Sequence, residues 1–176
     1  MNKYIVIGIG LVIILITGYF LLSNSTKGKD LTLLQEQSLK RDDQSSPTSQ
    51  FVDKQASFAI FTNGTFRVFT AAMYHNQSPN VYIEESNPNI VKVRKAGVTW
   101  NDFFSTLPLT LTKDCLTTGT KETFCTGSKG ALKFYLNGER TENMLDQEIQ
   151  NGDKLLVTFG IESEAIIKQQ IDKMPK

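Results

Sequence analysis

The chain has 176 residues, and its 19 lysines and arginines balance 18 aspartates and glutamates to a formal net charge of +1. This balance gives no electrostatic case for nucleic-acid binding, which normally needs a basic face. Charged residues make up 21% of the chain and aromatic residues 10%, which suffices for a core and argues against global disorder. The length suits one domain with accessory segments.

An uncharged, proline-free apolar segment, Tyr4–Leu22, follows the short basic start of the chain. About 20 apolar residues in a helix cross a hydrocarbon core of about 30 Å, and lipid offers the backbone no partners outside a helix. Residues 1–22 are therefore predicted to be a single-pass transmembrane anchor, which makes the membrane the first predicted partner. A buried core helix is the alternative that this length and position disfavour.

The same segment indicates the side of the membrane on which the rest of the chain lies. Lys3 precedes it and Lys27 and Lys29 follow it, so basic residues alone do not fix the orientation. An apolar segment behind a short basic start acts as a signal sequence, and the chain behind it is translocated. We expect a signal-anchor in the cell membrane with the C-terminal domain extracytoplasmic. A cleaved signal peptide stays open, since Ser23–Ser25 offers small residues although no A-x-A site is present.

Residues 23–56 are polar and are predicted to form a linker or stalk. Leu31, Leu34 and Leu39 have the spacing of a short amphipathic helix, but few apolar residues support it. Ser45–Ser49 has the composition of a loop. The folded extracytoplasmic domain is expected to span residues 57–176.

A β-hairpin is the first predicted feature of this domain. Phe58–Phe61 and Phe66–Phe69 are rich in β-favouring residues and flank Asn63-Gly64. Both positions of an Asn-Gly pair tolerate positive φ, which two-residue hairpin turns require.

Two strands and a helix are predicted next. Val81–Ile83 and Ile90–Arg94 read as strands on either side of a turn at Asn87–Asn89. Thr99 suits a helix N-cap, and the carboxylate of Asp102 suits the first helical turn. Four apolar residues recur at helical spacing: Trp100, Phe103, Phe104 and Leu107. We expect this aromatic face to be part of the core rather than a binding surface.

The last third of the chain carries the clearest strand signals. Leu132–Leu136 alternates in polarity and leads into a turn at Asn137-Gly138, while Asn151–Asp153 turns the chain into a strand at Leu155–Phe159. Strands before and after one helix indicate an α+β fold, for which a β-grasp-like sheet packed on the short helix is our preferred topology. Glu162–Met174 is predicted to be a C-terminal helix. Three residues are candidates for its buried side: Ala165, Ile166 and Ile171.

Cys115 and Cys125 are the only cysteines, and two cysteines in an exported domain usually pair. The polar segment between them contains Gly119, which allows it to turn, so we predict a disulfide that closes a hairpin or loop. The chain-entropy relation gives roughly 3 kcal/mol for a loop of this size. A redox-active pair, free thiols or a metal site are alternatives, although the C-x-x-C spacing is absent and two thiolates do not complete a zinc site.

The sequence contains few residues of the types that catalyse reactions or bind metals and cofactors. His75 is the single histidine, so a Ser-His-Asp or Cys-His mechanism would have to use it. No phosphate-binding glycine loop joins a strand to a helix, and no G-x-S-x-G surrounds a serine. We therefore predict no catalytic residue, no cofactor and no metal site. His75, Glu84 and Glu85 are the weak ligand candidates, although adjacent strand carboxylates point to opposite faces and solvated or loop positions are the plainer interpretation.

Several segments follow one another in a familiar order: FAIFTNG (58–64), VKVRKAGVTWNDFF (91–104), LTKDCL (111–116), LKFYLNGE (132–139), NGDKLLVTFG (151–160) and KQQI (168–171). This order resembles an uncharacterised family of small membrane-anchored extracytoplasmic proteins from archaea and uncultivated bacteria. The resemblance covers roughly Ser57–Lys176, and the NGD-to-FG ending also looks like the ends of β-grasp modules. Some members are loosely labelled disulfide isomerases, a label that the missing C-x-x-C does not support here.

The resemblance also bears on metal binding. Such proteins often carry an H-x-H pair before the T-W helix, where this chain has Lys92 and Arg94, and an H-E-H stretch, where it has Asp53–Gln55. Lysine and arginine offer hydrogen-bond donors and no lone pair for a metal. The resemblance therefore implies that this chain has lost any such metal site.

The sequence favours a membrane-tethered, non-catalytic interaction or binding module of the cell envelope, with an unknown protein or envelope partner and no nucleic acid. Two alternatives stay open. One is a metal- or ligand-binding accessory domain that uses His75 with Glu84 or Glu85. The other is a thiol–disulfide oxidoreductase that uses Cys115 and Cys125.

Overall fold

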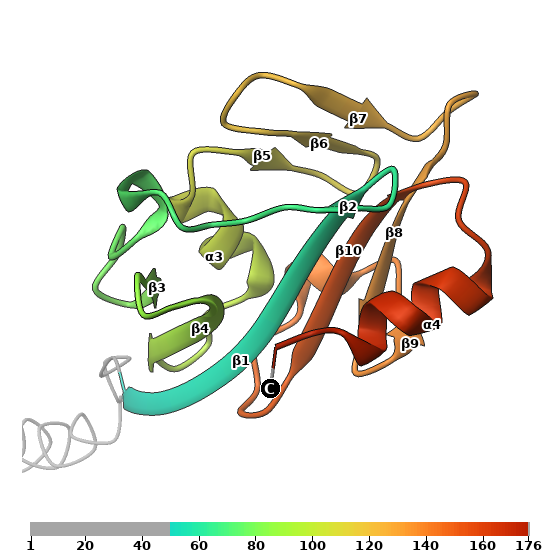
Figure 1. Cartoon of the computed structure of the whole chain (residues 1–176). Coiled ribbons are helices and arrows are strands. Elements are labelled where there is room, and N and C mark those ends of the chain that lie inside the picture. The colour runs from blue at the N-terminus through green and yellow to red at the C-terminus, as the bar shows by residue number, and fades with distance from the viewer. Residues whose placement is uncertain (1–49, 176) are drawn as a thin grey trace, which may run out of the picture. The chain divides into compact units, whose positions relative to one another are not determined.

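The computed structural model describes residues 50–175, which form an α+β fold around a mixed sheet (Figure 1). The apolar segment Tyr4–Leu22 and most of the predicted stalk lie outside the described residues. Neither α-helix within residues 50–175 has the length and apolar character that crossing a membrane requires.

The main sheet has seven strands, and its two central strands are parallel. Its path is β3 (Val81–Glu84), β4 (Asn87–Lys95), β1 (Phe51–Thr62), β10 (Lys154–Gly160), β8 (Ala131–Leu136) and β9 (Glu139–Arg140), and β2 (Thr65–Phe66) pairs with the end of β1. All pairings other than β1 with β10 are antiparallel.

Strand β1 begins earlier than the sequence indicates. Residues 51–56, predicted as part of the linker, belong to β1 and pair with β4. In this stretch Val52 and Lys54 are half-buried while Phe51, Asp53 and Gln55 are exposed. The alternation is that of a strand with one covered face, but its polar composition resembles a linker.

Strand β1 has two successive antiparallel neighbours on the same edge. Its first half pairs with β4, as far as Ser57 opposite Ile90, and its end pairs with β2. Between them, the side-chain amide of Asn89 donates to the carbonyl of Phe58 at 3.1 Å. The predicted hairpin turn is confirmed, with φ of 49° at Asn63 and 76° at Gly64.

The turn predicted at Asn87–Asn89 is wrong. These residues open β4, and the chain turns at Glu85 and Ser86 instead. Proline is tolerated at the beginning of a strand, and Pro88 is the second residue of β4.

The predicted helix is confirmed as α3 (Trp100–Thr106), which packs on one face of the sheet. Thr99 and Asp102 form a reciprocal capping box, in which each side chain accepts from the backbone N–H of the other. Trp100, Phe103 and Phe104 are buried in the main core. The ring of Phe58 in β1 lies 5.2 Å from that of Phe103 and 6.0 Å from that of Phe104, so the aromatic face is core as predicted.

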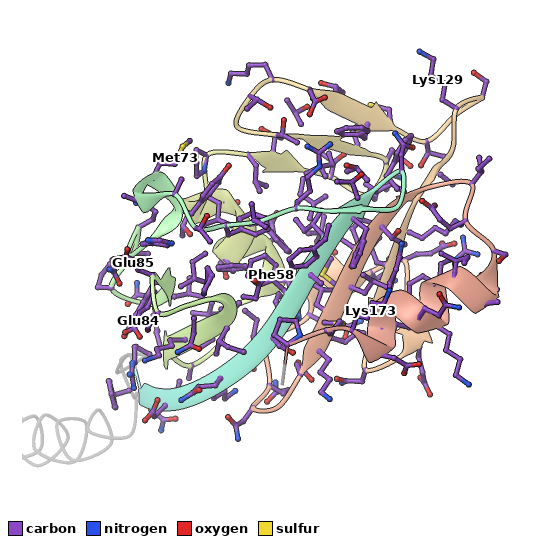
Figure 2. All side chains as sticks on the ribbon, in the orientation of Figure 1. Phe58, Met73, Glu84, Glu85, Lys129 and Lys173 are labelled. Atoms are coloured by element: carbon purple, nitrogen blue, oxygen red, sulfur yellow. A yellow bond between two sulfur atoms is a disulfide. The ribbon has the colours of Figure 1, made fainter. Side chains whose placement is uncertain are left out.

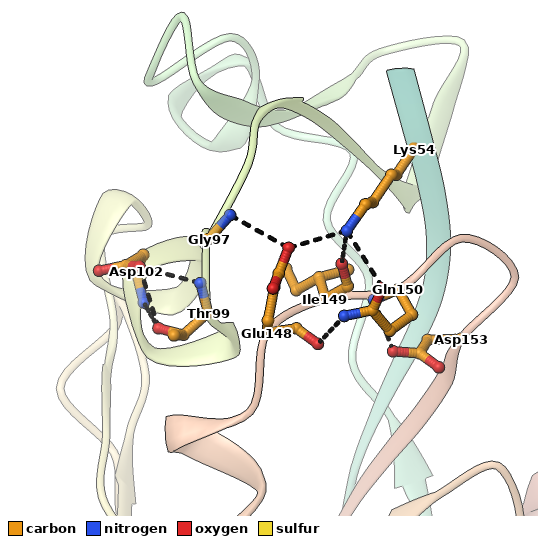
Figure 3. A network of polar contacts seen from close by, with 8 residues as sticks. All are labelled: Lys54, Gly97, Thr99, Asp102, Glu148, Ile149, Gln150 and Asp153. Atoms are coloured by element: carbon orange, nitrogen blue, oxygen red, sulfur yellow. Dashed lines mark hydrogen bonds and ion pairs between the residues drawn. The ribbon is translucent and has the colours of Figure 1, made fainter. Parts of the chain in front are cut away.

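A polar network fastens the segment before α3 to the sheet (Figure 3). Glu148 accepts from the ammonium of Lys54 at 2.8 Å and from the backbone N–H of Gly97 at 3.1 Å. Lys54 also donates to the carbonyl of Ile149 and the side chain of Gln150. These contacts hold the pKa of the Glu148 carboxyl below its usual range, the Lys54 hydrogen bond being the largest cause.

A small second sheet is inserted between α3 and β8. Its strands are β5 (Thr110–Leu111), β6 (Cys115–Thr117) and β7 (Thr123–Cys125), in that order. Cys115 lies directly opposite Cys125, and the predicted disulfide joins them. The backbone N–H of Thr126 donates to the carbonyl of Asp114, so the cysteine pair occupies a non-hydrogen-bonded position, where side chains are closest.

Helix α4 (Glu164–Asp172) packs on the opposite face of the sheet (Figure 1). Ile167 and Met174 are buried there against Ala59, Leu156 and Tyr135. Burial is the first cause that raises the pKa of Tyr135, whose hydroxyl donates to Glu164.

The predicted buried side of this helix is largely wrong. The side chains of Ala165 and Ile166 are exposed, and Ile171 is half-buried. Ile167 and Gln170, three positions apart and hence on one face, are buried instead.

Candidate binding site

A hollow of about 280 Å³ opens between the end of the β1–β2 hairpin and the inserted sheet. The segment Thr65–Phe69 borders one side of it, and residues Thr118–Thr120 of the turn between β6 and β7 border the other. Five apolar or aromatic residues also line it: Ile60, Phe69, Tyr74, Leu109 and Leu116. We call this feature the apolar hollow. Its volume suits one or two side chains or a small apolar group.

Exposed apolar side chains surround the apolar hollow. Phe66 is 38% exposed and Val68 64% exposed, and both border it. Met73, 49% exposed, belongs to the 3-10 helix η1 (Ala72–Tyr74) and extends from the side of the molecule (Figure 2). Its methyl carbon lies 3.4 Å from an ideal Cβ position at Gly119, another lining residue. Single exposed apolar residues are ordinary, whereas three beside one hollow make it the candidate binding site of the described residues.

Arg67 ties the hairpin to the inserted sheet. Its Nε donates to the hydroxyl of Thr62 at 2.6 Å, and its guanidinium forms an ion pair with Glu122 at 3.1 Å. The guanidinium also lies 5.1 Å from the ring centre of Phe124, a cation–π contact. The Arg67 guanidinium therefore holds one end of the apolar hollow in place, and its charge is already paired with Glu122.

Two close contacts fix the other borders of the hollow. An ideal Cβ at Gly119 would lie 2.9 Å from the carbonyl oxygen of Pro108 and 3.3 Å from the hydroxyl of Tyr74, so the turn approaches as closely as only glycine permits. Phe69 is held by His75, whose Nε2 lies 2.8 Å from the Phe69 carbonyl oxygen. A carbonyl oxygen only accepts, so the hydrogen is on Nε2.

The weak ligand candidates from the sequence have other surroundings. His75 lies in a loop, as expected, but its side chain is 9% exposed and bonded to Phe69. Glu84 forms an ion pair with Lys92 at 2.7 Å, and Glu85 is exposed at the adjacent turn (Figure 2). Within residues 50–175 no group of three or more histidine, cysteine, aspartate or glutamate side chains is placed to hold a metal ion.

The positions that the resemblance equates with histidines lie on neighbouring strands. Gln55 is directly opposite Lys92, and Arg94 forms an ion pair with Asp53. The hydrogen bond from Arg94 to Tyr82 is the first cause that raises the pKa of this arginine. The cations at these positions are therefore engaged with neighbouring side chains on the sheet.

The apolar hollow is the feature that sequence reasoning missed. Phe66–Phe69 was predicted as the second strand of a hairpin, but regular pairing covers only Thr65 and Phe66. The signal was present in the alternation itself, since Phe66 and Val68 would share one face and Arg67 and Phe69 the other. A strand with bulky apolar residues on both faces needs a cover on each side.

Comparison of the chain with protein-family models, with curated proteins and with solved structures finds no match.

Proposed function

We propose that this chain is a membrane-tethered, non-catalytic binding module of the cell envelope, and that the apolar hollow is its binding site. The observation that carries the proposal is a concave surface lined by Ile60, Phe69 and Leu116, with three partly or largely exposed apolar residues at its border: Phe66, Val68 and Met73. Concave, mostly apolar surfaces with a few polar groups are the usual form of binding sites.

The proposed extracytoplasmic position rests on two features. Tyr4–Leu22 has the length and composition of a signal-anchor. The disulfide between Cys115 and Cys125 supports an oxidising compartment, where such bonds persist.

We further propose a β-grasp-like arrangement for the domain, in keeping with the family that the sequence resembles. The strand order β4-β1-β10-β8-β9, with β1 parallel to β10 and α3 packed on one face, supports this arrangement. The inserted sheet β5–β7 and helix α4 would then be additions to the shared arrangement, and the hollow would belong to the first of them.

Site-specific photo-crosslinking tests the binding proposal. Val68 in the full-length membrane-bound protein is replaced with benzoylphenylalanine, and the same replacement at Ile161, which is 87% exposed, serves as the matched control. We expect one discrete covalent adduct from position 68 and none from position 161. A second variant, Thr120→Trp, fills the hollow from an exposed lining position and should abolish the adduct. Equal labelling at both positions, or none at either, would remove the proposal.

A thiol–disulfide oxidoreductase is the second candidate, since Cys125 is exposed on the outer strand β7. Thiol–disulfide exchange requires an accessible sulfur and a bond that the ambient thiol pool reduces. Incubation of the folded protein with a glutathione series, followed by alkylation and mass measurement, decides this candidate. A bond that stays oxidised throughout the series rules it out.

A further inference from the structure

We infer that the apolar hollow receives an extended segment of a partner polypeptide, which adds to the sheet as a strand along Phe66–Val68. This inference rests on the proposed binding function and names the partner class and the mode of its recognition. Three observations support it: the direction of the backbone groups of this segment, the apolar hollow beside it, and the fixed geometry at both of its ends.

The backbone of Phe66 has its polar groups directed away from β1. Arg67 donates its N–H to the carbonyl of Ile60, so Arg67 and Ile60 form a hydrogen-bonded pair. Hydrogen-bonded and non-hydrogen-bonded pairs alternate along an antiparallel ladder. Phe66, opposite Phe61, is therefore a non-hydrogen-bonded position whose N–H and C=O point outward.

Val68 lies two residues later, beyond the regular pairing of β2 with β1. Its N–H has no hydrogen-bond partner among residues 50–175. Phe66 thus offers an outward N–H and C=O, and Val68 offers an N–H that no residue within 50–175 accepts. Alternate positions of this kind on an open sheet edge are the template that an added strand uses. An extended polypeptide carries donors and acceptors at this spacing, so we assign a peptide segment rather than a small molecule to the edge.

The hollow accounts for side-chain recognition. Successive side chains of an added strand point to opposite faces. One set would enter the apolar hollow against Leu116 and Phe69, and the other would pack on the exposed side chains of Phe66 and Val68. An extended partner with apolar residues at alternate positions meets both requirements.

The segment Phe66–Val68 is already held in place at both ends in the absence of a partner. At one end the Asn63-Gly64 turn and the Arg67 contacts hold the segment, and at the other His75 holds the Phe69 carbonyl. A segment fixed in this way loses little conformational freedom on binding, which favours affinity.

A selection with random linear peptides displayed on phage tests the inference on the full-length protein in detergent micelles. Enriched peptides are synthesised with a fluorescent label and titrated against matched variants at one position. Val68→Pro keeps an apolar side chain but removes the outward N–H, whereas Val68→Ala keeps the N–H and trims the side chain. We expect Val68→Pro to weaken binding by roughly tenfold or more and Val68→Ala by less, because a peptide carbonyl loses its donor only in the former.

Amide hydrogen exchange supplies a second measurement that needs no variant. At saturating peptide, exchange of the Phe66 and Val68 amides should slow by roughly tenfold or more. The Arg67 amide, already bonded to Ile60, should be nearly unchanged and serves as the internal control. Retention of the wild-type urea midpoint by Val68→Pro shows that its loss of binding is local.

Three other outcomes would overturn the inference. Peptides that bind wild type and Val68→Pro equally would leave the hollow as a binding site and overturn strand addition. Failure to enrich any linear peptide would also overturn it, while the crosslinking result decides the proposed function separately. A dimer of the full-length protein that Val68→Pro dissociates would make a second copy of this chain the occupant and refute the partner assignment.

Discussion

Removal of the disulfide should lower the stability of the domain by about 3 kcal/mol. The change is the double substitution Cys115→Ala and Cys125→Ala, which leaves no unpaired thiol. The two cysteines are 10 residues apart, and the chain-entropy relation for a loop of this length gives about 3 kcal/mol at 25 °C. Cys125 is exposed and Cys115 half-buried, so little cavity cost adds to this value.

Urea unfolding followed by tryptophan fluorescence measures the effect, since Trp100, the single tryptophan, is fully buried in the core. For a domain of this size a loss of about 3 kcal/mol corresponds to a decrease in Tm of about 10 °C. The matched control is Thr117→Ala with Thr123→Ala, the neighbouring facing pair, whose hydroxyls lie 3.1 Å apart. A cross-strand pair of this kind contributes about 0.2–1 kcal/mol.

Comparison of the cysteine variant with the threonine control also distinguishes an effect on the unfolded chain from the loss of a cross-strand contact. Constraint of the unfolded chain predicts that the cysteine variant has a larger urea m-value than the wild type, because the unfolded state exposes more surface. A stability loss no greater than that of the threonine control, with an unchanged m-value, would refute the view that the disulfide acts on the unfolded chain.

Three further predictions concern local contacts. Thr99→Ala removes the N-cap of α3 and should cost about 1 kcal/mol in urea unfolding, whereas an equal stability would show that the capping box contributes nothing. Gly119→Ala places a Cβ against the Pro108 carbonyl and should cost about 1–3 kcal/mol, while Gly127→Ala, whose nearest neighbour is 3.9 Å away, should be close to neutral. Glu148→Gln tests the acid response, because Lys54 and then Gly97 lower the pKa of this carboxyl. A lowered folded pKa gives stabilisation that is present above the unfolded pKa, about 4.3, and is lost as the pH falls through the folded pKa. The wild type should therefore lose stability more steeply than Glu148→Gln below about pH 4.3, and parallel curves would contradict the role of the network.

Features encoded by a few neighbouring residues could be predicted from the sequence. The Asn63-Gly64 turn depends on two residues that accept positive φ, and the α3 cap on Thr99 with Asp102, so each is decided within a few positions. The pairing of Cys115 with Cys125 followed from their being the only two cysteines in the sequence and from the expectation that the domain is exported.

The errors came from features that depend on distant contacts. Residues 51–56 have a polar composition, and only their pairing with β4 makes them a strand. The side on which α4 is buried depends on the sheet beneath it, which selects Ile167 over Ala165 and Ile166. Periodicity indicates that a helix has a buried side, but several neighbouring apolar residues leave its exact direction open.

The apolar hollow shows the same limit at the level of function. Its two borders, residues 65–69 and 118–120, are about 50 positions apart in the sequence and meet because Arg67 reaches Glu122 and Phe124. Neither border carries a motif, and the residues that define the site are ordinary strand and turn residues. What distinguishes them is an arrangement: an edge segment with backbone N–H groups that find no acceptor within residues 50–175 lies beside a concave apolar surface. The proposed binding function depends on open hydrogen-bonding positions and exposed apolar area, and both are properties of the folded chain that no short sequence motif encodes.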